Sequence, residues 1–357
     1  MLHSTLTKQL APLKLNLARI KCINLLITSL LRHRTVNLTL LATENLTGAT
    51  NQSCYRRFQR FFLGSVLNLT SIGRFVLNKV PRPEQGWILS MDRTNWKYGK
   101  RHINILTVGI VVNRVAIPIA WRVLPQSTKR GNSHTKHRIK LFENVLRIMK
   151  PEEIHVLTMD REFGGKVWLK WLDQQGIGYI ARLKANTLVG HKLASEHTAT
   201  RQGRRATTRQ NILGMELFFA CKTITSKGRR DERLYLVSNR FHGPEALELY
   251  KLRWGIEQLF SHLKKRGFNL EDTHMTEAKK LEKLFALVTL AFLFSYAWGC
   301  HLRTTRKATK ANARKSLFRE GLESILRLLG NPHLKANERN EFIEWLRLPC
   351  LPSIFVV

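Results

Sequence analysis

The segment PEALELYKLRWGIEQLFSHLKKRGF, residues 244–268, decides how the rest of the chain is organised. After its first residue it contains no proline, and before Gly267 it contains only one glycine. It is therefore predicted to form one long helix with Pro244 in the first turn. At about 100° per residue, its larger apolar side chains fall on one stripe that a core can cover. These side chains are Leu249, Leu252, Ile256, Leu259, Phe260 and Leu263.

A strip of polar side chains runs beside that stripe, within about 60° of arc at the 3.6-residue period. Its members are Tyr250, Arg253, Glu257 and Lys264. The strip presents a carboxylate flanked by two cations and a phenol, which suits a metal ion held beside a phosphodiester. The alternative is a solvated polar face with one ion pair. An arginine four residues before a glutamate is, however, the weaker orientation for such a pair.

The chain carries a large excess of positive charge. Its 357 residues include 60 Lys and Arg against 25 Asp and Glu, a formal net charge of +35. Such an excess repels itself unless a polyanion neutralises it, and nucleic acid is the usual polyanion. A ribosomal or packaging protein can share this charge, but a hydrophobic content of 43% indicates a globular protein with a large core.

Cysteine usage and hydropathy favour a cytoplasmic protein outside the membrane. The five cysteines are scattered and never in C-x2-C spacing, which is typical of reduced thiols and not of a zinc site or a disulfide framework. The N-terminus has charges and Pro12 where a signal peptide needs an apolar core. The apolar segment 284–300 is at the short limit for a membrane span, so we interpret it as a buried core helix.

Residues 1 to about 80 are predicted to form a helical DNA-binding region. Cations are frequent there, and the densest cluster is Arg56, Arg57 and Arg60, interleaved with aromatic residues. Arginines on one face and aromatics on the other suit a helix that docks on a core while it touches phosphates. A plain amphipathic helix with a solvated basic face remains the alternative.

From about residue 85 to 303 the pattern becomes α/β. The predicted order is three antiparallel strands, a helix, a strand, a helix and a strand, with the second and third strands joined at Asn113 and Arg114. By analogy, this is the order of an RNase H-like core. A polar, basic stretch at about 184–232 is interpreted as a mostly β insertion, and residues 304–357 as a basic helical tail.

Two aspartates share one setting in this pattern. Asp92 ends the apolar run WILSM and Asp160 ends the run IHVLTM, and each is followed by arginine. If the two strands are neighbours, the carboxylates emerge side by side and repel unless a cation lies between them. Clustered oxygen ligands without cysteine favour Mg²⁺ or Mn²⁺, and two such ions can activate an attacking oxygen and stabilise a leaving one. Taken singly, each aspartate can equally be a turn former.

The spacing Y-x2-R-x3-E-x6-K at Tyr250, Arg253, Glu257 and Lys264 resembles the signature of the IS4 family of DDE transposases. Asp92, Asp160 and Glu257 match the three acids of that family in order, and the resemblance covers roughly residues 85–300. It implies an RNase H-like catalytic core, two Mg²⁺ or Mn²⁺ ions held by the three acids, and DNA contacts from the other members of the signature.

The resemblance also implies a function. The expected protein cleaves DNA at transposon ends and joins the freed 3′-hydroxyl to target DNA, in cut-and-paste transposition of an insertion sequence. Its expected partners are double-stranded DNA with terminal inverted repeats and a second copy of the chain in the synaptic complex. We expect it in the bacterial cytoplasm, associated with the nucleoid.

Two other functional classes remain open at this point. An RNase H-like nuclease with the same acids would cut DNA without joining it. A catalytically idle DNA-binding protein derived from a transposase would have lost at least one acid, whereas this chain has all three. Members of the resembled family stack a flipped base on an aromatic, for which Phe218, Phe219 and Tyr235 are candidates, with core packing as the alternative.

Overall fold

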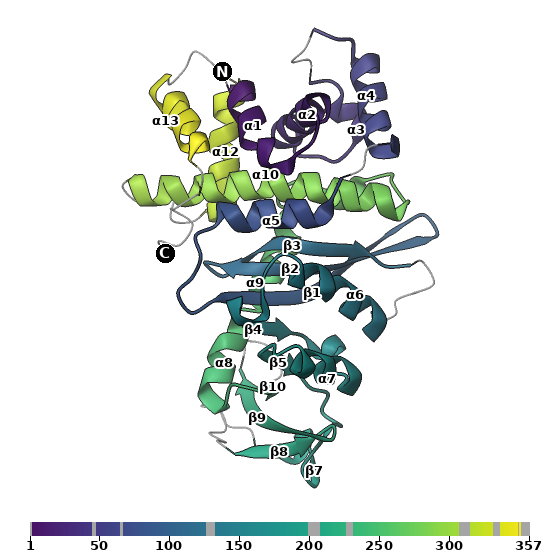
Figure 1. Ribbon diagram of the computed structural model, residues 1–357, viewed down its shortest axis with the longest axis vertical. Coiled ribbons are helices and arrows are strands. Elements are labelled where there is room, and N and C mark those ends of the chain that lie inside the picture. The colour runs from purple at the N-terminus through teal and green to yellow at the C-terminus, as the bar shows by residue number, and fades with distance from the viewer. Residues whose placement is uncertain are drawn as a thin grey trace.

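The computed structural model describes residues 2–44, 48–64, 67–125, 133–198, 208–225, 231–306, 315–330, 336–348 and 350. The molecule is elongated, with a helical layer at one end and a twisted sheet that extends to the other (Figure 1). The long helix α10 (Ala278–Thr305) and α5 (Leu69–Lys79) cross the molecule between the two.

The strands of the described residues form one sheet of ten strands, in the order β3-β2-β1-β4-β5-β10-β9-β8-β6-β7. β2 is antiparallel to β1 and β3, whereas β4 is parallel to both β1 and β5. The strands are β1 Trp87–Tyr98, β2 Arg101–Val112, β3 Val115–Val123, β4 Ile154–Met159, β5 Tyr179–Arg182, β6 Leu188–Val189, β7 Lys192–Leu193, β8 Arg209–Ile212, β9 Met215–Ile224 and β10 Glu232–Ser238.

The predicted hairpin is confirmed. β2 and β3 pair up to Val112 opposite Val115, and the two residues between them, Asn113 and Arg114, have φ of 46° and 63°. Two successive left-handed residues form the type of two-residue turn that follows the twist of antiparallel strands.

The stretch interpreted as an insertion contains β6 to β9, and these strands extend the central sheet. β9 pairs along its length with β10, and β10 in turn pairs with β5. At the far end of the molecule, β8, β6 and β7 form the edge of the same sheet (Figure 1). Residues 199–207 and 226–230 of this stretch lie outside the described part of the chain.

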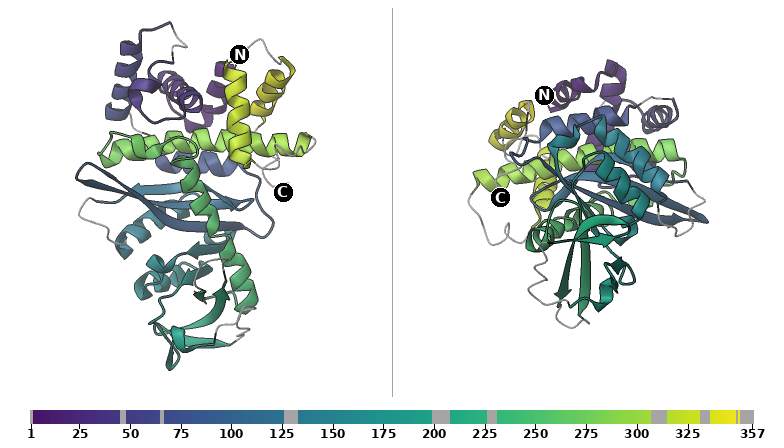
Figure 2. Two further views of the ribbon diagram at one scale, coloured as in Figure 1. Left: turned by 180° about the vertical axis from the view of Figure 1, so that it is seen from behind. Right: turned by 60° about the horizontal axis from the view of Figure 1, so that its bottom comes forward.

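Helices cover both faces of the sheet. α6 (Thr135–Leu146) and α7 (Lys166–Gln174) lie on the face toward the viewer in Figure 1, whereas α8 (Gly243–Lys251) and α9 (Trp254–Leu263) run along the opposite face, as Figure 2 shows from behind. Short 3-10 helices connect several elements: η1 Ala11–Leu13, η2 Pro151–Glu153, η3 Arg161–Phe163, η4 Ala194–Glu196 and η5 Leu270–Asp272.

The prediction of one helix over residues 244–268 is wrong. The chain forms α8 and α9 with Leu252 and Arg253 between them, and it leaves the helix after Leu263. Both linking residues keep right-handed helical angles, but the amide of Arg253 donates to the carbonyl of Tyr250, three residues back, at 3.0 Å. Such i→i+3 bonds tighten the turn. The Arg253 carbonyl accepts a hydrogen bond from the Ile256 amide at 3.1 Å and a second one from Ser90 Oγ of β1 at 3.4 Å, a contact that helical periodicity cannot reveal.

The apolar segment at 284–300 lies inside α10 and is buried, as predicted. Among the described residues, α10 is the only single helix that is long and apolar enough to cross a membrane. Within its most apolar stretch of 18 residues, 94% of the residues are buried in the protein. α4 and α5 pass the same test only as a pair bent by 106°. Sheet and helices pack around α10 on all sides, as expected for a helix that is apolar around its whole circumference.

The remaining helices form the layer above α10 in Figure 1. The N-terminal ones are α1 Leu2–Gln9, α2 Leu17–His33, α3 Leu38–Leu41 and α4 Asn51–Gly64, and the C-terminal ones are α12 Leu317–Gly330 and α13 Ala336–Arg347. α1 packs against α13, so the first helix and the last described helix meet in this layer. Asn16 and Asn68 cap α2 and α5 with side-chain oxygens, which accept hydrogen bonds from otherwise unpaired amides.

Candidate active site

Asp92 and Asp160 lie side by side on neighbouring strands. β1 and β4 are parallel, and Met91 lies opposite Met159 in their register, so the next residue of each strand is an aspartate. Asp92 lies within β1, whereas Asp160 follows the last residue of β4 and is the N-cap of η3. The structure therefore brings together the two carboxylates that the sequence pattern predicted to be neighbours.

Glu257 joins them from α9, which lies on the face of the sheet opposite α6 and α7 and packs against β1, β2 and β3 (Figure 2). Gly255 permits this approach: a Cβ there would lie 3.1 Å from the carbonyl oxygen of Arg114 and 3.2 Å from the amide of Ala116. The missing side chain at this one position thus lets α9 lie close against the start of β3, with Glu257 two residues farther along the helix.

Arg253 lies between two of the three acids. Its Nη1 is 3.4 Å from Asp92 Oδ2, and its Nη2 donates to Glu257 Oε1. The side chain of Arg253 is only 12% exposed. Burial opposes its charge, but Tyr250 and Glu257 raise the pKa of the guanidinium overall. Arg253 is therefore the cation that separates carboxylates which would otherwise repel one another.

Burial dominates the electrostatics of Asp92. It raises the pKa of this carboxyl to about 6; the Arg93 amide, which donates to Oδ1 at 2.7 Å, and the charge of Arg253 lower it, and the charges of the other two acids raise it. A carboxylate in this position gains from any additional cation that comes within reach.

Two polar atoms beside this cluster are buried without a hydrogen-bond partner among the described residues. They are Asp160 Oδ1 and the hydroxyl of Tyr250. Oxygen donors without sulfur or imidazole suit Mg²⁺ or Mn²⁺, so the residues present fit a divalent ion in their chemistry. Among the described residues, no group of three His, Cys, Asp or Glu side chains has an arrangement that could hold a metal ion. The positive charge in the cluster is that of Arg253.

Lys264 lies beside β1 at Asn95, and it does not join the three acids. It caps the C-terminus of α9, and its Nζ is 2.7 Å from Glu271 Oε1 and 3.0 Å from the carbonyl oxygen of Asn95. The ammonium also lies over the ring of Trp96, 5.9 Å from its centroid. Of the expected helical strip, Tyr250, Arg253 and Glu257 are thus grouped near the aspartates, and Lys264 is held separately.

Comparison with protein families identifies the region that carries this site. The model of the transposase DDE domain matches residues 79–294, which is more than half of the chain and includes all three acids. The chain belongs to the DDE transposase domain family. No curated protein matches the chain. Transposases act on DNA, and DDE domains typically use a divalent metal ion.

A further ion pair beside the two aspartates, between Arg93 and Glu162, was not predicted from the sequence. Arg93 Nε lies 3.2 Å from Glu162 Oε2, with both side chains nearly buried, and Arg93 also donates to Asn104. The other oxygen of Glu162 accepts hydrogen bonds from the amide and hydroxyl of Ser133 at 2.7 and 2.8 Å. The pair joins the residue after Asp92 to the 3-10 helix that follows Asp160. Its sequence signal was the arginine after Asp92 together with the glutamate two residues after Asp160.

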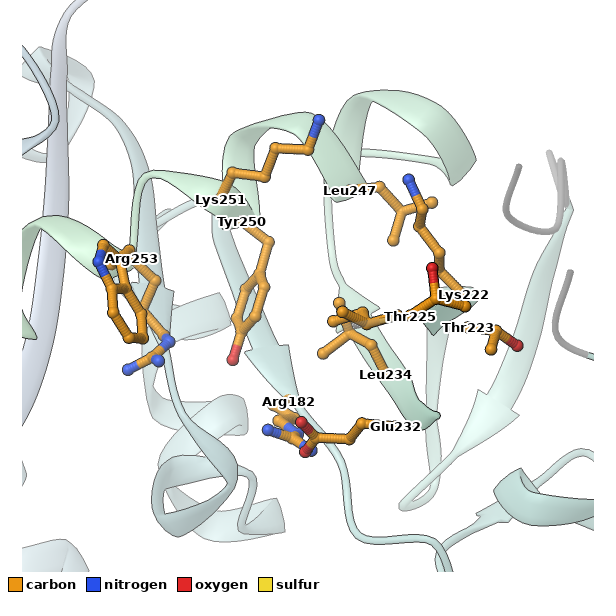
Figure 3. A pocket seen from close by; sticks show the side chains of 12 residues that line it. Arg182, Lys222, Thr223, Thr225, Glu232, Leu234, Leu247, Tyr250, Lys251 and Arg253 are labelled. Atoms are coloured by element: carbon orange, nitrogen blue, oxygen red, sulfur yellow. The ribbon is translucent and has the colours of Figure 1, made fainter. Parts of the chain in front are cut away.

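A cavity of about 630 Å³ opens next to the acids of the DDE domain. Figure 3 shows Tyr250 and Arg253 on one side of it, Lys222, Thr223 and Thr225 on the other, and Arg182 with Glu232 between them. Lys251 and the 55% exposed Trp254 also line the cavity. Because cations and an exposed indole surround it, the cavity suits an anionic ligand with flat rings.

The predicted DNA-contacting arginines of α4 lie far from this site. Arg56, Arg57 and Arg60 are exposed, and the aromatic side chains between them face the core. α4 itself lies in the helical layer, on the other side of α10 from β1 (Figure 1).

Of the three candidate stacking aromatics, Phe219 and Tyr235 are buried in the core of the DDE domain. Phe218 is half-buried under the guanidinium of Arg209, which lies 5.0 Å from the ring centroid. Core packing therefore accounts for the first two. The described aromatic residues that line the cavity are Tyr250, which is buried, and Trp254, which is exposed.

Proposed function

We propose that this DDE transposase is a cut-and-paste transposase of the IS4 family, with an RNase H-like catalytic core. The observation that carries the proposal is the meeting of Asp92 and Asp160 on adjacent parallel strands with Glu257 arriving from α9. The strand order β3-β2-β1-β4-β5, with only β2 running against its neighbours in this group, supports the RNase H-like assignment.

Asp92, Asp160 and Glu257 would hold the divalent ions, Mg²⁺ or Mn²⁺ and two in number. Bound ions of this kind polarise the phosphodiester and lower the pKa of an attacking water. The contribution of the chain is to present the three carboxylates from a rigid sheet and a helix packed on it. The buried and unpartnered Asp160 Oδ1 supports a role as a ligand.

The reaction has two parts under this proposal. Hydrolysis at the transposon end breaks a phosphodiester and leaves a 3′-hydroxyl, and that hydroxyl then displaces a 3′-oxygen of target DNA to form the new bond. Neither part needs a covalent link between protein and DNA. Tyr250, Arg253 and Lys264 would position phosphates around the scissile one, since arginine can grip a phosphate through two parallel hydrogen bonds.

The proposed function assigns a role to each part of the chain. Residues 1–80, with Arg56, Arg57 and Arg60, would bind DNA; residues 85–303 would form the catalytic domain with its β stretch at about 184–232; residues 304–357 would form the helical tail. We infer that a homodimer brings two terminal inverted repeats together in the synaptic complex. The DNA beside the gene supplies the test substrate: short inverted repeats flanked by a duplicated target sequence.

The first test is Glu257→Gln, assayed on a duplex that ends in those repeats. We expect this variant to lose strand cleavage in Mg²⁺ while its affinity for the duplex stays nearly unchanged, because glutamine keeps the shape but removes a charged ligand oxygen. Cleavage at the wild-type rate would show that Glu257 is not part of the active site.

A strand-transfer assay with the wild-type chain separates transposase from nuclease. Joined products in a target plasmid are expected. Cleavage without joining would mean that the protein is a nuclease, and binding without cleavage would mean an idle DNA-binding protein.

A further inference from the structure

The Arg253 guanidinium contacts two of the three carboxylates that the proposed function assigns to divalent ions. It contacts Asp92 with one nitrogen and Glu257 with the other. The side chain is 12% exposed and those of the two acids are 21% and 34% exposed, so this is not an ordinary surface ion pair. With both carboxylates engaged, Arg253 neutralises part of the charge that a metal ion would otherwise balance.

This bridge is built by tertiary structure. In an isolated helix, an arginine four residues before a glutamate is the weaker arrangement. Here the helix tightens at residues 252–253, and Ser90 of β1 donates a hydrogen bond to the carbonyl of Arg253. That contact fixes the Arg253 backbone against the strand that carries Asp92, so the side chain reaches both acids at once.

The cavity beside the acids offers the guanidinium a second position. Arg253 lines this cavity together with Lys222 and Lys251 (Figure 3). A phosphate that enters it meets several cations and can take two parallel hydrogen bonds from arginine. One side chain thus borders both the acidic cluster and the cavity.

We propose that Arg253 is an internal cation that competes with the divalent ion for Asp92 and Glu257, and that a DNA phosphate in the adjacent cavity releases it. The proposal rests on the proposed function of the three acids. Two cations cannot share the same carboxylate oxygens without repulsion, so the ion binds weakly until the guanidinium leaves. Metal ion and DNA then bind cooperatively, each raising the affinity of the chain for the other by the same factor.

The test measures Mn²⁺ binding directly, from the electron paramagnetic resonance signal of free Mn²⁺ in titrations of the full chain without DNA. We expect Arg253→Ala to bind Mn²⁺ about tenfold more tightly than the wild type, since the competing charge-assisted hydrogen bonds are gone. Lys251→Ala is the matched control. It removes one positive charge that lines the same cavity and is paired with Glu248, and it should leave Mn²⁺ affinity unchanged.

The second arm repeats the titration with the duplex that ends in the inverted repeat. Wild type should gain Mn²⁺ affinity when the duplex is added, and Arg253→Ala should gain several-fold less. Arg253→Lys should lie between the two in the absence of DNA, because an ammonium cannot bridge both acids.

The outcomes separate the two proposals. If Arg253→Ala and wild type bind Mn²⁺ equally without DNA, the competition is wrong and the catalytic assignment stands. Equal gains from the duplex in both proteins would also overturn the competition. If wild type binds no Mn²⁺ even with the duplex, and Asp160→Asn does not differ from it, the proposed metal site itself is wrong.

Discussion

At the scale of single residues, the pair of Arg93 and Glu162 holds the two segments that carry the aspartates. Arg93 follows Asp92 and its side chain is 13% exposed, and Glu162 is 14% exposed. Glu162 also accepts two hydrogen bonds from Ser133, the residue before the cap of α6. A nearly buried carboxylate that accepts hydrogen bonds from three donors holds the middle of β1, next to Asp92, against η3, next to Asp160.

We expect Glu162→Ala to lower the free energy of unfolding by about 2–4 kcal/mol, because it leaves a nearly buried guanidinium and the Ser133 donors without an acceptor. Cleavage should fall by at least about tenfold at saturating DNA, while the affinity for the duplex is retained. Glu248→Ala, which removes a fully exposed ion pair with Lys251, should leave both melting temperature and cleavage unchanged. A Glu162→Ala protein that melts lower but cleaves normally would confine the pair to a structural role.

At the scale of elements, α10 and α12 cross with their backbones in contact at two glycines. A Cβ on Gly299 would lie 1.8 Å from the carbonyl oxygen of Leu317, and a Cβ on Gly321 would lie 1.9 Å from that of Ser295. Any side chain at these positions must push the helices apart. Since α10 also packs against the sheet that carries the acids, this crossing links the helical layer to the catalytic half.

Gly299→Ala should lower the free energy of unfolding by about 1–3 kcal/mol, because overpacking of the crossing outweighs the roughly 1 kcal/mol that alanine adds to a helix. Gly330→Ala, at the end of α12 with no atom within 4 Å of its added Cβ, should be neutral or slightly stabilising. Denaturant titrations of the two variants decide the matter. Equal stabilities would show that the helices separate without cost.

His262 attaches α9 to the same helices. It is 2% exposed, its ring lies against Phe318 with centroids 4.8 Å apart, and burial together with Arg266 lowers its pKa to about 4. Above about pH 6.5 the imidazole is neutral in folded and unfolded chains alike. As the pH falls from 6.5 toward 4, only the unfolded chain takes up the proton, so the free energy of unfolding drops by about 3 kcal/mol.

The matching experiment compares His262→Phe with wild type across this window. The variant keeps an aromatic ring against Phe318 but cannot titrate, so its stability should fall less between about pH 7 and about pH 4.5. Parallel curves for the two proteins would show that His262 is protonated in the folded chain or that it does not titrate separately.

At the scale of the whole molecule, positive charge dominates and is concentrated unevenly. The chain has a net charge of +35, and residues 1–80 contain one acid, Glu44, whose carboxylate is already paired with Arg32 and His33. The exposed arginines of α4 therefore have no acid of their own region left to pair with. Such a surface attracts DNA phosphates over long distances.

DNA affinity should fall at least about 100-fold between about 50 and about 200 mM salt, because each phosphate contact releases condensed counterions. Replacing Arg56, Arg57 and Arg60 together by glutamine should reduce the logarithmic salt slope by roughly three. Fluorescence anisotropy with a short duplex measures both quantities. A slope that the triple variant does not change would remove α4 from the DNA interface, and a nearly flat slope for wild type would contradict DNA binding through phosphates.

The sequence by itself determined the elements and the place of two of the acids. Strand alternation, the two-residue turn at Asn113 and Arg114 and the apolar run in α10 were all readable, because each depends on neighbours within a few positions. Asp92 and Asp160 could be paired because both follow apolar runs, and a parallel register then places them side by side. Periodicity also grouped Tyr250, Arg253 and Glu257 on one side of one segment.

Tertiary structure alone decided which partners those residues take. The carbonyl of Arg253 in the turn between α8 and α9 accepts a hydrogen bond from Ser90, 163 residues away in the chain, and the bridge to Asp92 spans 161 residues. Lys264 is drawn to Glu271 and Asn95, and the β stretch adds its strands to the central sheet instead of standing apart. A local pattern specifies which face of an element is apolar, but the partner of a buried charge is chosen by the packing of distant segments, whose contacts leave no period in the sequence.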